Sequence, residues 1–172
     1  MTILISRVFA AAALVVCIPL SNAHADVSLV EAAPTSSTAS EAVGDLVVSG
    51  GFARAMLPGA KVGGGYLTIV NPGSKADRLI SVSSPAAGRV ELHEMAMEGE
   101  VMRMRALKEG LAIAAGETIA LAPGGKHLMF FGVAEPFEEG ASVAVTLTFE
   151  HAGAVEAALA VLSSGATQAE QK

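Results

Sequence analysis

The sequence of 172 residues is poor in cysteine, in aromatic side chains and in clustered positive charge. Its one cysteine is Cys17, it has one tyrosine, and it has no tryptophan. The formal net charge is −6 and Lys and Arg form no cluster, whereas nucleic acids and anionic membranes are bound through concentrated positive charge. We therefore expect no nucleic-acid partner and no membrane-surface partner.

The motifs of common enzyme classes are also missing. The sequence has no Gly-x-Ser-x-Gly turn, and the glycines at 63–65 lack the Lys and Ser/Thr that follow in a phosphate-binding loop. Nothing in the sequence indicates an enzyme.

The N-terminus has the pattern of a secretory signal, with Arg7, an apolar run over 8–20 and Ala23-His24-Ala25 before Asp26. The run is shorter than the roughly 20 residues that span a bilayer, so cleavage after Ala25 is favoured over an anchor. A lipid-modified Cys17 is the alternative, but Val16 is bulky where that processing favours a small residue. Cleavage leaves a periplasmic chain without cysteine and without stable membrane insertion, so disulfides and thiolate metal sites are excluded.

The remaining chain reads as one domain. Residues 1–25 are the signal peptide, 26–43 a flexible linker of small and polar residues, 44–162 the folded domain and 163–172 a disordered tail. Short alternating stretches separated by Gly and Pro predict about nine strands, hence an all-β antiparallel sandwich or barrel. The last apolar stretch, over 154–162, is expected to close the fold as a hairpin strand.

Four methionines and one histidine lie within residues 93–104. We expect two strands, 90–97 and 101–107, joined at Glu98-Gly99. With a two-residue loop, His93 opposes Met104 and Met95 opposes Met102, and one face carries all of these side chains together with Met97. The other face pairs Glu94 with Arg103. A three-residue loop would shift this register by one.

A second cluster, KHLMFFGV, puts His127 and Met129 on one face of a strand. Histidine and methionine from the two clusters would make a site of neutral nitrogen and sulfur donors. Thioether sulfur is soft and favours Cu(I), whereas zinc sites normally use thiolate, imidazole and carboxylate. On spacing alone, however, core packing of the methionines is slightly favoured over metal binding, because Met is a common filler of irregular cores. We expect His151, in an apparent turn, to be solvated.

The constellation resembles the periplasmic copper chaperone family PCuAC, whose signature is His, ten residues, Met, about twenty-one residues, then His-x-Met. Ten residues separate His93 from Met104, twenty-two separate Met104 from His127, and His127-Leu128-Met129 supplies the last part. The extra residue falls across expected turns, where insertions are tolerated. Segments such as GGFARAMLPGAKVGGGYLTIVNPGSKADRL extend the resemblance over about Leu46 to Leu162.

The resemblance implies a cupredoxin-like β-sandwich or Greek-key barrel that binds Cu(I) through His93, Met104, His127 and Met129. It also implies a monomeric metallochaperone that passes copper to a periplasmic or membrane acceptor, such as the copper centre of a respiratory oxidase or a second copper chaperone. Met95, Met97 and Met102 lie outside the signature; they are core, an entry path or a second weak site, with core favoured.

Three other classes of function remain open. A copper storage or detoxification protein would use the same donors. A non-metal sandwich module for adhesion or assembly predicts a buried, dry methionine face. An electron-transfer cupredoxin is disfavoured, because a blue-copper site needs a Cys thiolate.

Overall fold

The computed structural model describes residues 40–168. The expected signal peptide with its cleavage site, residues 26–39 of the expected linker and residues 169–172 of the expected tail lie outside the described residues. The described part contains strands, turns and loops, and it has no helix that is long and apolar enough to cross a membrane.

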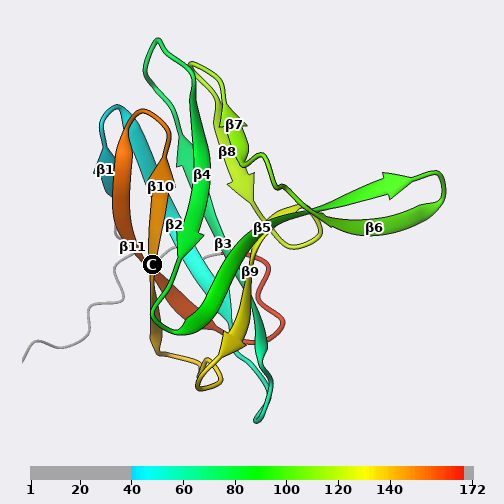
Figure 1. The fold of residues 1–172 in the computed structure, drawn as a ribbon. Coiled ribbons are helices and arrows are strands. Elements are labelled where there is room, and N and C mark those ends of the chain that lie inside the picture. The colour runs from blue at the N-terminus through cyan, green and yellow to red at the C-terminus, as the bar shows by residue number, and fades with distance from the viewer. Residues whose placement is uncertain (1–39, 169–172) are drawn as a thin grey trace, which may run out of the picture. The chain divides into compact units, whose positions relative to one another are not determined.

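The strands are numbered in the order in which they occur along the chain (Figure 1). Their bounds are β1 Glu41–Val43, β2 Leu46–Arg54, β3 Val62–Val70, β4 Asp77–Ser83, β5 Ala87–Glu98, β6 Val101–Ala106, β7 Leu111–Ile113, β8 Thr118–Leu121, β9 Lys126–Val133, β10 Ser142–Phe149 and β11 Gly153–Leu162.

Seven strands close into a barrel in the order β2-β11-β10-β4-β5-β9-β3, because β3 pairs back with β2. The other strands extend its edges: β1 pairs with β2, β8 with β3, β7 with β4 and β6 with β5. All pairs are antiparallel except β11 with β2, which run parallel. The predicted all-β fold is confirmed, with a parallel closing pair that the sequence did not indicate.

The nine strands expected from the sequence are present, and the 154–162 stretch does form a hairpin strand, β11, on β10. The two additional strands, β1 and β7, have three residues each, too few to show an alternating pattern. Strand β1 takes up Glu41–Val43, the last three residues of the segment expected to be linker.

The core lies inside the barrel and is built by alternation. In β10, the side chains of Val143, Val145, Leu147 and Phe149 are buried, and the residues between them are not. The same period in β9 buries Leu128 and Phe130, so that His127 and Met129 point to the outer face of the sheet. Burying each such apolar side chain stabilises the fold by about 1.5–3 kcal/mol. Because Leu128 and Phe130 must face the core, the alternation also fixes the face of the sheet that carries His127.

The glycines of β3 let the barrel close tightly over this core. A Cβ atom on Gly65 would lie 2.7 Å from the Phe130 ring and 3.0 Å from Leu159. Because the two side chains already fill that space, any larger residue at position 65 would push β3 away from the core.

Strand β5 belongs to the barrel in its first part and leaves it in its second (Figure 1). Residues 87–94 pair with β9, whereas residues 93–98 pair with β6. The β5–β6 hairpin therefore projects from the barrel, and His93 lies where the two pairings overlap.

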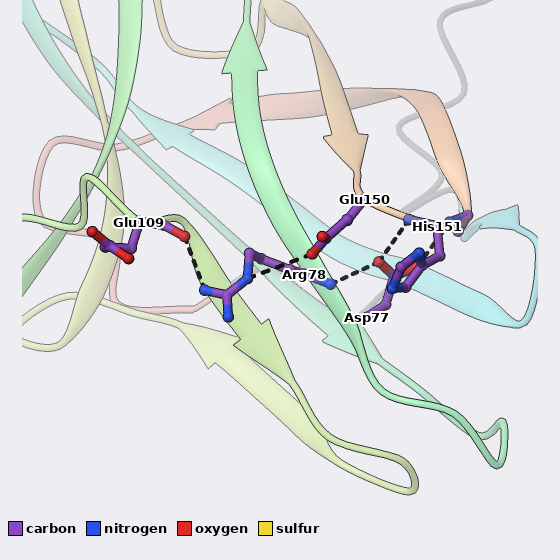
Figure 2. A network of polar contacts seen from close by, with 6 residues as sticks. Asp77, Arg78, Glu109, Glu150 and His151 are labelled. Atoms are coloured by element: carbon purple, nitrogen blue, oxygen red, sulfur yellow. Dashed lines mark hydrogen bonds and ion pairs between the residues drawn. The ribbon is translucent and has the colours of Figure 1, made fainter.

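At the β10–β11 turn, the Asp77 carboxylate accepts hydrogen bonds from the backbone N–H groups of Arg78, His151 and Ala152 (Figure 2). Arg78 continues this network through Glu150 and the Glu109 carbonyl. The His151 side chain is exposed, as expected, so this network joins β4 to the turn without using the imidazole.

Candidate metal centre

The two histidines of the expected site lie side by side. His93 of β5 and His127 of β9 are direct partners across an antiparallel pair, with ring centroids 6.0 Å apart. Directly opposed residues share a face of the sheet. Both histidines are largely shielded from solvent, since the side chain of His93 is 13% exposed and His127 is 7% exposed.

The two signature methionines lie on the same face but on opposite sides of this pair. Met129 is two residues beyond His127 and pairs with Glu91, whereas Met104 of β6 pairs with Met95. Each is a diagonal neighbour of His93, within reach of a long side chain. Met129 and Met104 are separated by four residues of β5, about 13 Å along the strand. The structure thus brings His93, His127 and Met129 together and sets Met104 at the outer edge.

His93 has one nitrogen engaged and one free. Its Nε2 lies 2.9 Å from Glu91 Oε2, and because a carboxylate only accepts, Nε2–H is the donor. In the neutral imidazole, Nδ1 then carries the lone pair, and it is buried with no hydrogen-bond partner. A buried polar atom without a partner is destabilising by about 1–3 kcal/mol, so this lone pair is a strong candidate for metal binding.

Glu91 is held as a carboxylate. The hydrogen bond from His93 is the main cause that lowers the pKa of Glu91 below its ordinary value, against a smaller opposing effect of burial, and Arg89 lowers it further. Arg89 Nε lies 2.8 Å from Glu91 Oε1, and the same guanidinium stacks over Phe131 at 4.4 Å. The ring centroids of Phe131 and His93 are in turn 5.9 Å apart. The Glu91 carboxylate orients the His93 imidazole in the same way as carboxylates that accept a hydrogen bond from metal-bound histidines.

His127 is oriented by the backbone instead. Its Nδ1 lies 2.9 Å from the Gly125 carbonyl oxygen, which can only accept, so Nδ1 carries the proton. In the neutral ring, Nε2 of His127 then carries the free lone pair. The two rings thus offer opposite nitrogens, Nδ1 from His93 and Nε2 from His127.

The predicted register of the hairpin is wrong by two residues. His93 opposes Ala106, Met95 opposes Met104, and Met97 opposes Met102. The loop is Gly99-Glu100 rather than Glu98-Gly99, because Gly99 takes a positive φ of 66° at the first loop position, as the tight hairpin turns require. A shift of two keeps every side chain on its face, so the predicted set of His93, Met95, Met97, Met102 and Met104 on one face is confirmed.

The favoured assignment of the extra methionines to the core is wrong for two of them. Met97 is 59% exposed and Met102 is 50% exposed, as is the signature residue Met104. They are exposed because the hairpin projects from the barrel, and no second sheet among residues 40–168 packs against it. The buried, dry methionine face expected of a non-metal module is absent from the described hairpin.

The charge pairing on the other face also differs from the prediction. Glu94 pairs with Arg105 of β6 at 2.9 Å and Lys126 of β9 at 3.4 Å, rather than with Arg103, which pairs with Glu98 at 3.0 Å. Mainly through the Arg105 hydrogen bond, these cations lower the pKa of Glu94 below its ordinary value. This row crosses three strands next to His93 and joins the hairpin base to the barrel.

The donor set narrows the chemistry of the site. No group of three or more His, Cys, Asp or Glu side chains within residues 40–168 is placed to hold a metal. A metal ion at His93 and His127 would need thioether sulfur to complete its ligands, and Met129 and Met104 are the methionines beside them. Two imidazoles with thioether suit Cu(I) better than a hard cation.

Two supporting groups were not identified from the sequence, namely the Glu91 carboxylate and the Gly125 carbonyl. Glu91 could have been found, because residues i and i+2 of a strand share a face and Glu91 precedes His93 by two. The Gly125 carbonyl could not, because its direction depends on the backbone of the turn before β9.

Comparison with known proteins places the chain in a family. The profile of a family described as putative lipoprotein, LpqE-like, matches residues 46–161. A putative lipoprotein of Leifsonia xyli subsp. xyli, Lxx21020, is 38% identical over 81 residues, which are 47% of this chain and 49% of that protein. This match thus spans about half the length of the curated relative.

Solved structures share the fold. The copper-bound PCuAC domain from PmoF2 is 26% identical, with a TM-score of 0.62 over 73% of this chain and 98% of that domain. The CuI form of DR1885 from Deinococcus radiodurans, at 23% identity and a TM-score of 0.57, covers 73% of this chain and 82% of that protein and supports the fold alone. The predicted resemblance to PCuAC domains is confirmed.

Proposed function

The chain belongs to the LpqE-like family, and from that premise we propose that it is an extracytoplasmic Cu(I) metallochaperone. In this proposal the cargo is held by His93 Nδ1, His127 Nε2 and Met129, and Met104, about 13 Å along the strand from Met129, is the outer ligand that meets the ion on entry and exit. The observation that carries the proposal is the opposed histidine pair, in which each ring has one nitrogen fixed by a hydrogen bond and the other free. The copper-bound PCuAC domain of PmoF2, with the same fold, supports it.

The position of the ligands suits a carrier rather than a permanent site. The histidines are shielded, whereas Met104 is half exposed on the projecting hairpin. An incoming or outgoing Cu(I) ion can therefore exchange ligands at Met104 before or after it reaches the imidazoles. An acceptor that offers its own soft ligands can approach the same edge, and a respiratory oxidase copper centre or a second copper chaperone is such an acceptor.

The binding half of the proposal is tested by competition with a Cu(I) chelator. His93→Ala and His127→Ala should each weaken Cu(I) binding by more than tenfold, or about 1.4 kcal/mol. His151→Ala is the matched control, because its imidazole is exposed and far along the chain from the pair. Unchanged affinity in both site variants would remove the copper site from this pair.

The delivery half needs a transfer measurement. The copper-loaded protein should pass Cu(I) to the copper-free soluble domain of an oxidase copper subunit faster than free chelated copper does. Equal rates would indicate storage or detoxification rather than delivery.

A further inference from the structure

The part of the hairpin beyond the histidines carries a row of methionines that the proposed centre does not use. Met95 opposes Met104 and Met97 opposes Met102, so two adjacent cross-strand pairs are made of thioethers alone. The Cβ atoms of an opposed pair are about 5 Å apart, and successive pairs on one face are about 7 Å apart. Methionine has three rotatable side-chain bonds, so three of these sulfurs can converge on one point.

These side chains are exposed because the hairpin projects from the barrel, so core packing does not explain why they are methionine. Met97, Met102 and Met104 are each at least half exposed, as are Leu57 in a loop and Val101 on the reverse face of the hairpin. The reverse face of the hairpin carries Glu94, Glu98, Arg103 and Arg105 in ion pairs, so it does not bury the ribbon either.

The composition of the face indicates a metal rather than a protein partner. Beyond His93 and Ala106, its side chains are methionine only, without Leu, Ile, Val or an aromatic ring. A docking surface needs apolar area, which any of those residues would supply, whereas only methionine also supplies a neutral soft ligand. Neutral sulfur ligands without carboxylate favour a soft monovalent ion.

We propose that Met95, Met97 and Met102 form a second binding site for a soft monovalent metal, Cu(I) or Ag(I), separate from the histidine centre. Met97 is four residues from His93 along β5, about 13 Å, which is too far for one ion to bind both. Met104 lies between the two sites. This inference stands on the hairpin alone and holds whether or not the histidine pair binds copper.

The test is an anaerobic Cu(I) titration of the mature chain, following bound metal and the methionine methyl NMR signals. The wild type should bind two equivalents, one of which shifts the methyl signals of Met97 and Met102. The Met97→Leu/Met102→Leu variant conserves side-chain volume at two exposed positions and should bind one equivalent of Cu(I). Met56→Leu, a methionine after β2 and outside the hairpin, is the matched control and should bind two.

His93→Ala/His127→Ala separates this inference from the proposed function. It should retain one equivalent, bound by sulfur alone in X-ray absorption. If it retains two, the histidine centre is wrong and the hairpin site is unaffected. The hairpin site is overturned if the wild type binds one equivalent with no shift of the Met97 and Met102 methyls, if Met97→Leu/Met102→Leu still binds two, or if that variant binds none.

Discussion

At the scale of single residues, the two imidazoles of the proposed centre are oriented by hydrogen bonds to different partners. Glu91 accepts a hydrogen bond from Nε2–H of His93, and the Gly125 carbonyl accepts one from Nδ1–H of His127. A side chain can be removed by substitution, whereas a carbonyl cannot. The orientation of His93 is therefore the one that mutation can test directly.

Glu91→Ala should weaken Cu(I) binding about tenfold without removing any ligand, because His93 loses the acceptor that fixes its tautomer and ring direction. Chelator competition measures the affinity, and Glu138→Ala, which removes a surface carboxylate elsewhere, is the control. An unchanged affinity in Glu91→Ala would show that the free nitrogen of His93 does not depend on this carboxylate.

Asp77 makes stability depend on acid at a place remote in sequence from the histidines. Burial raises the pKa of its carboxyl, but the hydrogen bonds from Arg78, His151 and Ala152 outweigh burial and leave the pKa below its ordinary value of 3.8. Because the pKa of Asp77 is lower in the folded state, its carboxylate contributes fully to the free energy of unfolding at any pH above the pKa of the unfolded chain. This contribution is lost as the pH falls through the lower pKa of the folded state.

Asp77→Asn should therefore lower the free energy of unfolding by about 1 kcal/mol at neutral pH, because one of its amide contacts is left without an acceptor. The difference in free energy of unfolding between Asp77→Asn and the wild type should narrow below pH 3.8. Denaturant unfolding at several pH values measures it, with Asp45→Asn, in the nearby β1–β2 turn, as the charge-matched control. A difference that stays constant down to full protonation would contradict the proposed role of the carboxylate.

At the scale of elements, the β5–β6 hairpin shows how far the sequence can be read. Period-2 alternation predicted which side chains share a face, since that depends only on odd and even positions. The register depended on where Gly99 sits in the turn, and two loops with Gly were compatible with the same sequence. The exposure of Met97 and Met102 depended on whether another sheet covers the hairpin, which is a property of the whole fold.

The His-x-Met pair on β9 was predictable for the same reason as the hairpin face. Leu128 and Phe130 had to face the core, so His127 and Met129 had to face outward. That His127 lies directly opposite His93 was not predictable, because β5 and β9 are far apart in the sequence and their register is set by closure of the barrel.

The ion-pair row at the base of the hairpin should control its motion more than its stability. Glu94→Ala removes the partner of both Arg105 and Lys126, and exposed pairs of this kind contribute at most about 1 kcal/mol each. Backbone amides of β6 should exchange hydrogen faster, with little change in the melting temperature. Glu98→Ala, which removes only the Arg103 pair near the tip, should have a smaller effect. Equal exchange rates in the two variants would contradict a special role for the row.

At the scale of the whole molecule, the fold separates stability from metal binding. The apolar side chains that hold the barrel point inward, and the candidate ligands lie on its outer face or on the hairpin. Ligand substitutions should therefore change copper binding while leaving the core intact. Under the proposed function, this separation lets the protein release copper without unfolding.

The proposal places the protein outside the cytoplasm, and its mature N-terminus is the corresponding prediction. Mass spectrometry of the exported protein should find Asp26 as the first residue, because Ala23-His24-Ala25 has the small-x-small pattern of a cleavage site. A chain that begins at an acylated Cys17 would contradict this, and it would agree with the putative lipoproteins among its relatives.

The most direct test of the central claim is which imidazole nitrogens bind the metal. Long-range ¹⁵N–¹H NMR of the histidine rings, before and after one equivalent of Cu(I), should show the metal on Nδ1 of His93 and Nε2 of His127. The other nitrogen of each ring should stay protonated, and the His151 signals should not change. Metal on the opposite nitrogens, or unchanged signals from both His93 and His127 with copper bound, would contradict the account.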